Sequence, residues 1–237
     1  MGGAVAEIIH IEQLRFEYDS KRVLDGIDLS VDVGEALVLL GPSGVGKSTL
    51  LRLIAGLLSP TAGSVTVHPT DAGIGPRMVF QQPRLFPWMT VRGNLEFALR
   101  AANVPSADWS GRIEPLMEQV GLMGELDADV SSLSIGMAQR VALVRSLACR
   151  PSVLLLDEPF SALDPKRRRQ LQQDLLKLVG FTRVSVVMVT HDIQEAIDIG
   201  DRVVVINGSP ATVACAHTIG PHNAAEVKQQ IESELLR

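Results

Sequence analysis

The sequence predicts an α/β protein with a mostly parallel central sheet, an N-terminal antiparallel β subdomain and an inserted α-helical lobe. Three observations lead to this prediction. A glycine-rich loop at 41–49 joins an apolar strand to a helix, strands and helices alternate from residue 153 onward, and residues 90–130 have an irregular helical pattern with few β-branched side chains. The 237 residues are enough to bury a substantial core, either as one large domain or as one domain with a lobe inserted.

Two short, partly alternating segments open the chain. Residues Ile8–Phe16 and Val23–Val31 alternate apolar and polar side chains over part of their length, which indicates strands of an antiparallel sheet. The turn between them, Phe16–Ser20, carries Tyr18, the one tyrosine of the sequence. A brief strand is expected at Ser64–Val67.

The glycine-rich loop follows the pattern Gly, four residues, Gly-Lys-Ser. It comprises Gly41, Pro42, Ser43, Gly44, Val45, Gly46, Lys47, Ser48 and Thr49. A short buried strand at Glu35–Leu40 precedes it, and apolar residues at helical spacing follow it over Thr49–Leu58. Glycines allow successive backbone N–H groups to face a phosphate chain, and the helix adds its positive N-terminal end. Lys47 can reach the β- and γ-phosphates and Ser48 can offer a hydroxyl to Mg²⁺, so we expect the chain to bind a nucleoside triphosphate with Mg²⁺.

The rest of the chain consists of a helical stretch followed by an α/β half. The helical stretch at 90–130 is interrupted at Pro105 and Gly121, and Ser134 is the expected N-cap of one helix that runs to Ala148. The remaining expected elements are strands at 153–156, 185–189 and 202–206, helices at 165–179 and 193–199, and a peripheral helix in the polar tail 223–237. Alternating strands and helices indicate a mostly parallel sheet.

Two acidic residues, Asp157 and Glu158, follow the apolar strand at 153–156. A parallel strand that ends beside the phosphate loop would place Asp157 where it holds Mg²⁺ through water. Glu158 is then suited to orient or deprotonate an attacking water. A charged strand end is common in proteins, but its position downstream of a phosphate loop favours the catalytic interpretation.

Several motifs together resemble the ATPases of ABC transporters. Leu133–Arg140 resembles their signature motif, and Pro159–Asp164 resembles the segment that follows the second acidic residue, including the D-loop. Gln81 matches the Q-loop glutamine, Tyr18 matches the aromatic residue that stacks on adenine, and His191 matches the switch histidine.

The resemblance covers about residues 8–208 and implies a P-loop NTPase core within a single ABC ATPase domain over 1–237. It places the RecA-like core at about 1–82 and 151–210, the helical lobe at about 83–150 and a short C-terminal tail at 211–237. In this family two subunits pair head to tail, and ATP lies between the phosphate loop of one and the signature helix of the other.

By residue match, the resemblance implies a catalytic pair, a metal site and a set of nucleotide contacts. The catalytic residues are Glu158 as the base and His191 as the group that stabilises the γ-phosphate and the attacking water. The metal residues are Ser48, Gln81 and Asp157. The contacts with ATP are Tyr18, the loop Gly41–Thr49, Gln81, Ser134, Gly136 and Asp164.

The segment Phe80–Arg92 is similar to that of the ATPases of nitrate, sulfonate, taurine and related importers. The resemblance therefore implies a homodimeric ATPase that closes on ATP to drive import of a small solute, for instance an anion such as nitrate, sulfonate or taurine. It also implies transmembrane permease subunits, a solute-binding protein and a peripheral position on the cytoplasmic face of the inner membrane. If exposed, Phe86, Trp88 or Met89 would fit the groove that receives a helix of the membrane subunit.

Composition excludes several other classes of protein. A net charge of −5 argues against a dedicated nucleic-acid binder, and the basic run Lys166–Arg169 is expected to be a solvated helix face. No apolar run approaches the roughly 18 residues of a membrane span. Residues 1–7 show no secretion signal, and Ala6 stands where myristoylation requires Ser or Thr. Cys149 and Cys215 are isolated, which is typical of inert thiols in a reducing cytoplasm.

Two alternative functions stay open at this point. One is a soluble ABC-type ATPase that acts on DNA or ribosomes, but the long coiled-coil insertions or tandem ATPase domains usual in that class are missing from this sequence. The other is a slow-hydrolysing subunit that pairs with a different ATPase chain, because Ile135 replaces the first glycine of the usual Leu-Ser-Gly-Gly signature. Glycine there allows close backbone approach to the opposite γ-phosphate, whereas isoleucine restricts the backbone.

Overall fold

The computed structural model of the chain describes residues 6–68 and 74–235. The predictions for residues 1–5 and for the last two residues of the tail lie outside the described residues. The chain forms two compact units. The first takes its residues from 1–69, 155–158 and 185–237, and the second takes its residues from 70–154 and 159–184.

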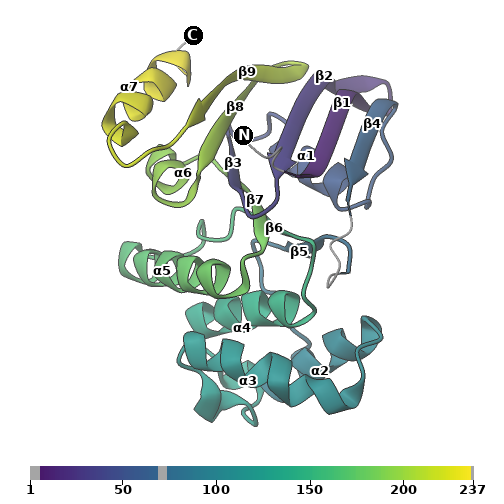
Figure 1. Cartoon of the computed structure of the whole chain (residues 1–237), viewed down its shortest axis with the longest axis vertical. Helices are drawn as coiled ribbons and strands as arrows, with labels where there is room; N and C mark the ends of the chain where they lie inside the picture. The colour runs from purple at the N-terminus through teal and green to yellow at the C-terminus, as the bar shows by residue number, and fades with distance from the viewer. Residues whose placement is uncertain (1–5, 69–73, 236–237) are drawn as a thin grey trace. The chain divides into compact units, whose positions relative to one another are not determined.

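The first unit contains a mixed β-sheet (Figure 1). Its strands are β1 (Glu7–Tyr18), β2 (Lys21–Asp32), β3 (Ala36–Leu40), β4 (Ala62–Val67), β6 (Val153–Asp157), β7 (Ser185–Thr190), β8 (Arg202–Gly208) and β9 (Ala211–Thr218). They follow the order β4-β1-β2-β9-β8-β3-β7-β6, and β6 belongs to this unit from Leu155 onward. β3 pairs in parallel with both β7 and β8, which confirms the predicted parallel centre.

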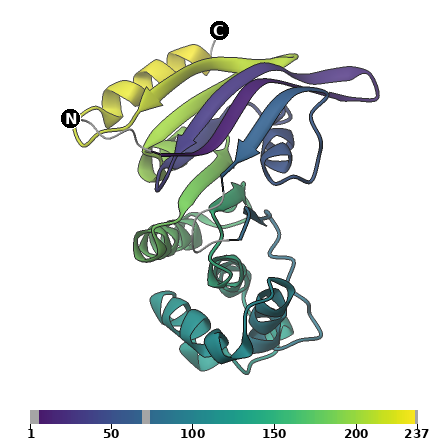
Figure 2. The same ribbon diagram turned by 45° about the vertical axis from the view of Figure 1, so that its right-hand side comes forward.

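The N-terminal strands form the predicted antiparallel subdomain. β1 pairs antiparallel with β2 and with β4, and Figure 2 shows these three strands side by side. Asp19 and Ser20 join β1 to β2 with φ angles of 44° and 68°. Such left-handed values at both central residues are typical of a type I′ hairpin turn, which matches the twist of the two strands. The side chains of Ile9, Ile11 and Leu14 are buried, while the polar residues between them stay exposed.

The strand β9 was not predicted, and residues 211–218 belong to the sheet rather than to a tail. β9 pairs antiparallel with β8 and in parallel with β2 at Leu24 and Ala211, so it joins the N-terminal strands to the parallel strands. Burial alternates along β9, but the less exposed positions include Ala211, Cys215 and His217. These side chains have little preference for strands, so the sequence pattern was weak.

The helix α1 (Lys47–Ile54) follows the glycine-rich loop, and it begins and ends earlier than the predicted Thr49–Leu58. Gly56 has a φ of 69°, and the N–H of Leu57 donates to the carbonyl of Arg52. A glycine in this left-handed conformation satisfies the last carbonyls of a helix and ends it.

Two further helices complete the first unit. They are α6 (Ile193–Ile199), which has the predicted bounds, and α7 (Ala224–Leu235). α7 lies beside β9 (Figures 1 and 2). It buries Val227 and Ile231, so the predicted tail helix packs on the unit through one apolar face.

The second unit is mainly helical. Its regular elements within the described residues are β5 (Arg77–Val79), α2 (Val91–Ala101), η1 (Ser106–Asp108), α3 (Trp109–Gln119), η2 (Met123–Glu125), η3 (Val130–Ser132), α4 (Ile135–Ala148) and α5 (Pro165–Thr182). Both predicted breaks are present, because Pro105 precedes η1 and Gly121 adopts a φ of 67° after α3. Thr90 and Ser134 cap α2 and α4 by accepting backbone N–H groups of the first helical turn.

The second unit extends beyond the helical lobe predicted at 83–150, because it also includes α5. Arg140 of α4 forms an ion pair with Asp174 of α5, with 2.8 Å between the guanidinium Nε and a carboxylate oxygen. The Asp174 side chain is only 4% exposed, so loss of Arg140 would leave a costly buried charge. This pair ties the two helices together.

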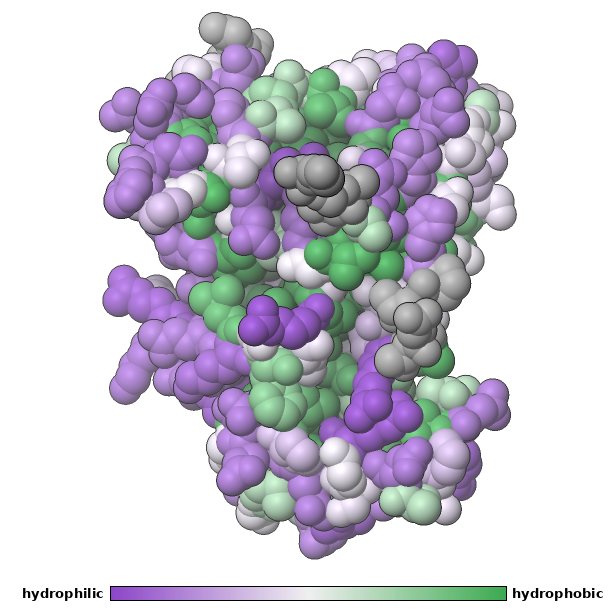
Figure 3. Space-filling model, in the orientation of Figure 1, coloured by the Kyte–Doolittle hydropathy of each residue, from purple (hydrophilic) through white to green (hydrophobic). Residues whose placement is uncertain are grey.

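Within residues 6–68 and 74–235, every helix is too short or too polar to cross a bilayer. Hydrophilic residues predominate on the face drawn in Figure 3, with smaller apolar patches between them. Cys149 and Cys215 are free thiols, and burial raises the pKa of both, as expected of inert cysteines.

Candidate functional site

A cavity of about 570 Å³ opens in the first unit at the ends of several strands. It is lined by three backbone segments and one acid: the β1–β2 hairpin at 18 and 21–23, the glycine-rich loop at 42–49, residues 207–209 where β8 ends and the turn to β9 begins, and Glu158. The structure therefore brings Tyr18 to the glycine-rich loop, as the sequence analysis predicted. The lining by the 207–209 turn was not predicted, because in the sequence this segment is recognisable only as a turn.

The backbone of the loop depends on three glycines. Gly44 and Gly46 have φ angles of 80° and 121°, which other residues rarely adopt. Gly41 is required for a different reason, because a Cβ added there would lie 2.2 Å from the carbonyl oxygen of Ile206. The loop thus rests directly against the end of β8.

Lys47 lies inside the loop and is only 4% exposed. Its Nζ donates to the carbonyl oxygens of Gly41, at 2.7 Å, and Pro42, at 2.8 Å. Burial lowers the pKa of Lys47 from its ordinary value, and the nearby charges of Glu158 and Asp157 oppose that shift.

Ser48 and Asp157 bring two oxygen atoms together beside the loop. The Ser48 hydroxyl donates to Oδ1 of Asp157 at 2.7 Å. Hydroxyl and carboxylate oxygens are ligands that Mg²⁺ prefers, and Mg²⁺ is commonly completed by water and substrate phosphates rather than by a full protein cage. Within the described ranges, no group of three or more His, Cys, Asp or Glu side chains could hold a metal ion by itself. The hydroxyl of Ser48 and the carboxylate of Asp157 fit Mg²⁺ that a nucleotide also ligates.

Glu158 and His191 form an acid and imidazole pair in the first unit. His191 Nδ1 lies 3.5 Å from Oε2 of Glu158, and the Glu158 N–H donates to the carbonyl of Val189. Glu158 has a φ of 46°, a left-handed value that is uncommon for a residue with a side chain. Such backbone strain costs about 1–3 kcal/mol and is found preferentially at functional sites.

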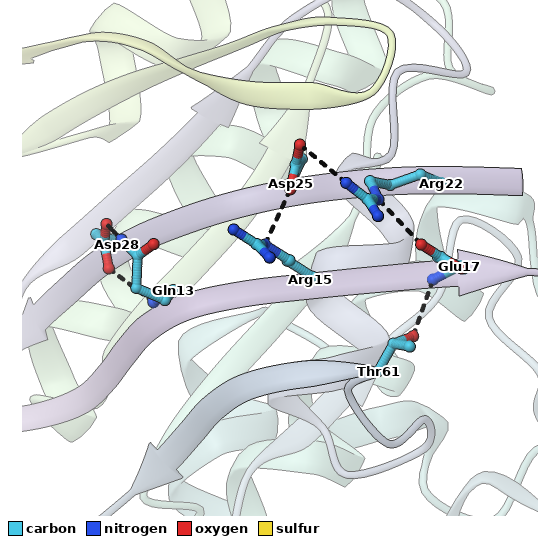
Figure 4. A network of polar contacts seen from close by, with 7 residues as sticks. All are labelled: Gln13, Arg15, Glu17, Arg22, Asp25, Asp28 and Thr61. Carbon is cyan, nitrogen blue, oxygen red and sulfur yellow. Dashed lines mark hydrogen bonds and ion pairs between the residues drawn. The ribbon is translucent and has the colours of Figure 1, made fainter.

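Tyr18 ends β1 with its ring 4.7 Å from that of Phe16, in an edge-to-face arrangement, and it is 41% exposed. The hairpin that carries it is braced by polar contacts (Figure 4). Arg22 pairs with Glu17 at 2.9 Å and with Asp25 at 3.4 Å. These contacts tie the start of β2 to the end of β1 beside Tyr18.

The same network continues along the two strands (Figure 4). Arg15 pairs with Asp25 at 3.0 Å, and both the backbone and the side-chain amide of Gln13 donate to Asp28. The hydroxyl of Thr61, the residue directly before β4, accepts a hydrogen bond from the N–H of Glu17 at 3.1 Å. A braced hairpin presents the exposed face of an aromatic ring in one fixed place.

The second unit holds the other predicted site residues. Ser134, Gly136 and Asp164 line one cavity of about 490 Å³. Asp164 caps α5 as Ser134 caps α4, and a Cβ on Gly136 would meet no atom within 4 Å. Ile135, which replaces the expected glycine, is 56% exposed.

Gln81 is fixed in the second unit by two hydrogen bonds. Its side-chain amide donates to the Ser161 hydroxyl at 3.0 Å, and its carbonyl accepts from Nε2 of Gln139 at 2.8 Å. The Gln139 amide also donates to the carbonyl of Pro159 at 3.2 Å. The sequence analysis missed this role of Gln139, whose side chain is only 2% exposed, because its partners Gln81 and Pro159 are distant in the chain.

Comparisons with known proteins agree with this arrangement. A protein-family model described as ABC transporter matches residues 24–161. An aliphatic sulfonates import ATP-binding protein of Xanthomonas axonopodis pv. citri is 48% identical over 217 residues, which cover 89% of this chain and 84% of that protein. A nitrate import ATP-binding protein of Synechocystis sp. is 42% identical over 199 residues, which cover 83% of this chain and 75% of that protein. The solved structure of cbiO1 from Clostridium perfringens, part of the ABC transporter complex cbiONQ, has a TM-score of 0.82 and 27% identity, and covers 98% of this chain and 95% of that one.

Proposed function

Because the chain belongs to the ABC transporter family, we propose that it is the ATP-binding and ATP-hydrolysing subunit of an ABC importer. The observation that carries the proposal is the cavity formed by the glycine-rich loop and the Tyr18 hairpin, with Glu158 in its wall. The two compact units are proposed to be the core and the helical lobe of one ATPase domain, with α5 on the side of the lobe.

The glycine-rich loop binds the triphosphate in this proposal. Backbone N–H groups at the start of α1 point to the phosphates and the helix end favours their negative charge. Lys47 exchanges its contacts with two loop carbonyls for contacts with β- and γ-phosphate oxygens. Tyr18 stacks on the adenine ring through its exposed face.

Ser48 and Asp157 are proposed to hold Mg²⁺. Ser48 offers its hydroxyl oxygen, and Asp157 accepts hydrogen bonds from metal-bound water. When bound, Mg²⁺ offsets the negative charge of the phosphate oxygens. The metal role implied for Gln81 stays a prediction.

Glu158 is proposed to take a proton from the attacking water. Its left-handed backbone and its contact with the His191 ring fix the direction of the carboxylate. A positioned base of this kind contributes about 10²- to 10⁴-fold to a rate. His191, beside it, is proposed to hold the γ-phosphate and the water in line.

A second subunit is proposed to complete the site. Ser134 and Gly136 lie at the start of α4, and the positive end of that helix suits a γ-phosphate bound to a partner copy. Asp164 lines the same cavity and is proposed to link the two sites across the dimer.

The proposed transport partners are permease subunits and a solute-binding protein, with the chain bound at the cytoplasmic face of the inner membrane. The names of the two relatives support a small anionic solute such as nitrate or an aliphatic sulfonate. Trp88 is 75% exposed, and the Phe86 ring lies 5.4 Å from it and 4.8 Å from the Phe97 ring. An exposed aromatic cluster of this kind fits a surface that docks on another protein.

Reconstitution tests the proposed function. The chain is co-expressed with the permease subunits of a sulfonate or nitrate importer and placed in liposomes with the matching solute-binding protein. We expect the chain to co-purify with the permease and to hydrolyse ATP faster when nitrate or an alkyl sulfonate is present with the binding protein. Hydrolysis by the isolated chain, with no association and no stimulation, would instead support an ATPase that is not linked to transport.

Replacing Tyr18 by Ala is expected to weaken ATP binding by about 1 kcal/mol or more, because base–aromatic stacking contributes about 1–3 kcal/mol per base. Tyr18→Trp keeps a stacking surface and is expected to bind normally. Calorimetric titration with ATP measures both variants. Equal affinities for the wild type and Tyr18→Ala would remove Tyr18 from the nucleotide site.

The exposed side chain of Ile135 favours the second candidate function, a slow-hydrolysing subunit. A β-branched residue beside Ser134 is expected to hold the α4 terminus away from the opposite γ-phosphate, and one lost transition-state donor costs roughly 3 kcal/mol. Ile135→Gly is therefore expected to raise ATP turnover of the assembled transporter with little change in ATP affinity. The affinity for ATP is expected to stay unchanged, because most contacts with ATP come from the glycine-rich loop of the opposite subunit.

Ile135→Ala serves as the matched variant, since it removes the branched side chain but keeps a Cβ. Its turnover is expected to lie between those of the wild type and Ile135→Gly in a steady-state phosphate-release assay. Unchanged or lower turnover in Ile135→Gly would show that isoleucine fits the closed site.

A further inference from the structure

The turn between β8 and β9 lies between the two elements that are proposed to bind the ends of a nucleotide. The sheet order here is β2-β9-β8-β3. β2, which belongs to the hairpin that carries Tyr18, lies on one side of the β8–β9 pair. β3, which leads into the glycine-rich loop, lies on the other side. A nucleotide has the same order of parts, with the sugar between the base and the phosphates. The sheet therefore places the 207–209 turn at the level of the sugar.

Two close contacts fix the turn in that place. Gly41 approaches the carbonyl of Ile206 so closely that a Cβ would overlap it, which holds the phosphate loop against the residue before Asn207. On the other side, Leu24 of β2 pairs with Ala211 at the start of β9. The turn is thus held on both sides within one unit.

Asn207, next to last in β8, is the half-buried polar side chain at this end of the strand and lines the cavity. Its Oδ1 accepts the N–H of Gly208 at 2.8 Å, which orients the side-chain amide. Its Nδ2 makes no hydrogen bond to any described residue of the chain. An amide with one end fixed and the other end free offers two donors of defined direction to a ligand.

The other polar side chains on this side of the cavity are less suited to the sugar. The guanidinium of Arg22 already forms ion pairs with Glu17 and Asp25. Lys21 is exposed at the tip of the hairpin, where its flexible ammonium group has no fixed direction. Ser209 lies beyond Gly208 and is exposed.

We propose that Asn207 is a specificity residue that donates a hydrogen bond from Nδ2 to a ribose hydroxyl oxygen of the bound nucleotide. The proposal rests on the proposed ATP site. It assigns to Asn207 the discrimination between ribonucleotides and deoxyribonucleotides, which neither the stacking of Tyr18 on a base nor the phosphate loop provides.

The test compares the affinity of the full chain for ATP, 2′-deoxyATP and 3′-deoxyATP by calorimetry. The wild type is expected to prefer ATP over at least one deoxy analogue by about fivefold, since a neutral hydrogen bond contributes about 1 kcal/mol. Asn207→Ala and Asn207→Leu are expected to reduce this ratio to about one, because neither side chain can donate to or accept from a ribose hydroxyl. Asn207→Leu keeps nearly the volume of asparagine, so thermal unfolding of the two variants separates loss of the hydrogen bond from collapse of the turn.

Thr212→Ala is the matched control, because Thr212 faces Asn207 across the hairpin but does not line the cavity. It is expected to keep the wild-type ratio. If the wild type binds ATP and both deoxy analogues equally, or if the Asn207 variants keep the ratio, the ribose contact is refuted while the ATP site stands. If the ratio is lost in Lys21→Ala and not in the Asn207 variants, the contact belongs to the hairpin. If the wild type binds no ATP, the proposed function fails as well.

Discussion

Replacing Glu158 by Gln is expected to lower ATP turnover by about 10²- to 10⁴-fold, because a glutamine amide cannot accept the proton of the attacking water. ATP affinity is expected to stay close to that of the wild type, since the loop, Lys47 and Tyr18 are unchanged. The variant should then accumulate as an ATP-bound dimer, because closure needs the phosphate contacts but not the activation of water.

Phosphate release measures the rate, and light scattering with ATP measures the dimer. Glu12→Gln removes an exposed carboxylate of β1 that lies outside the nucleotide cavity, so it serves as the control and is expected to hydrolyse ATP normally. A Glu158→Gln protein that turns over ATP at the wild-type rate, or that binds ATP normally and stays monomeric, would contradict the assignment of Glu158 as the base.

Gly41→Ala is expected to destabilise the chain by about 1–3 kcal/mol and to abolish tight ATP binding, because overpacking forces the backbone to shift. The added Cβ would overlap the carbonyl oxygen of Ile206, which belongs to a buried strand and has no room to withdraw. The loop would have to move away from β8, and the phosphate-binding N–H groups would move with it.

Gly180→Ala is expected to stabilise the chain, in contrast to Gly41→Ala. Gly180 lies in the interior of α5, and a Cβ there would meet no atom within 4 Å. Alanine in a helix is favoured over glycine by about 0.5–1 kcal/mol, so this variant should be more stable than the wild type. Thermal unfolding followed by circular dichroism compares the two variants. A Gly41→Ala protein as stable as Gly180→Ala would show that the loop has space that the structure does not indicate.

Much of the fold was predictable because its signals are local. The glycine-rich loop needs a strand before it and a helix after it, and β3 and α1 supply them. The cap at Ser134 and the breaks at Pro105 and Gly121 follow from the chemistry of single residues. The site residues of the first unit came together because parallel strands end at one edge of the sheet.

The parts that could not be predicted depend on contacts between distant segments. β9 carries small and polar residues and is defined by its partners β8 and β2 rather than by its own pattern. Gln139 acts through the carbonyls of Gln81 and Pro159, and no sequence spacing reveals such partners. The lining of the cavity by Asn207 likewise follows from sheet order and not from a motif.

The position of Lys47 has a consequence for the thermodynamics of nucleotide capture. In this structure the ammonium group of Lys47 already stabilises the loop, because it donates to the carbonyls of Gly41 and Pro42. The same ammonium group is proposed to bind the nucleotide. Capture is then an exchange of acceptors at a preorganised charge, so little ordering entropy is lost at the lysine. The enthalpy released by the lysine is correspondingly modest. The selectivity of the loop for triphosphate over smaller anions is then expected to arise from the backbone N–H groups of the loop.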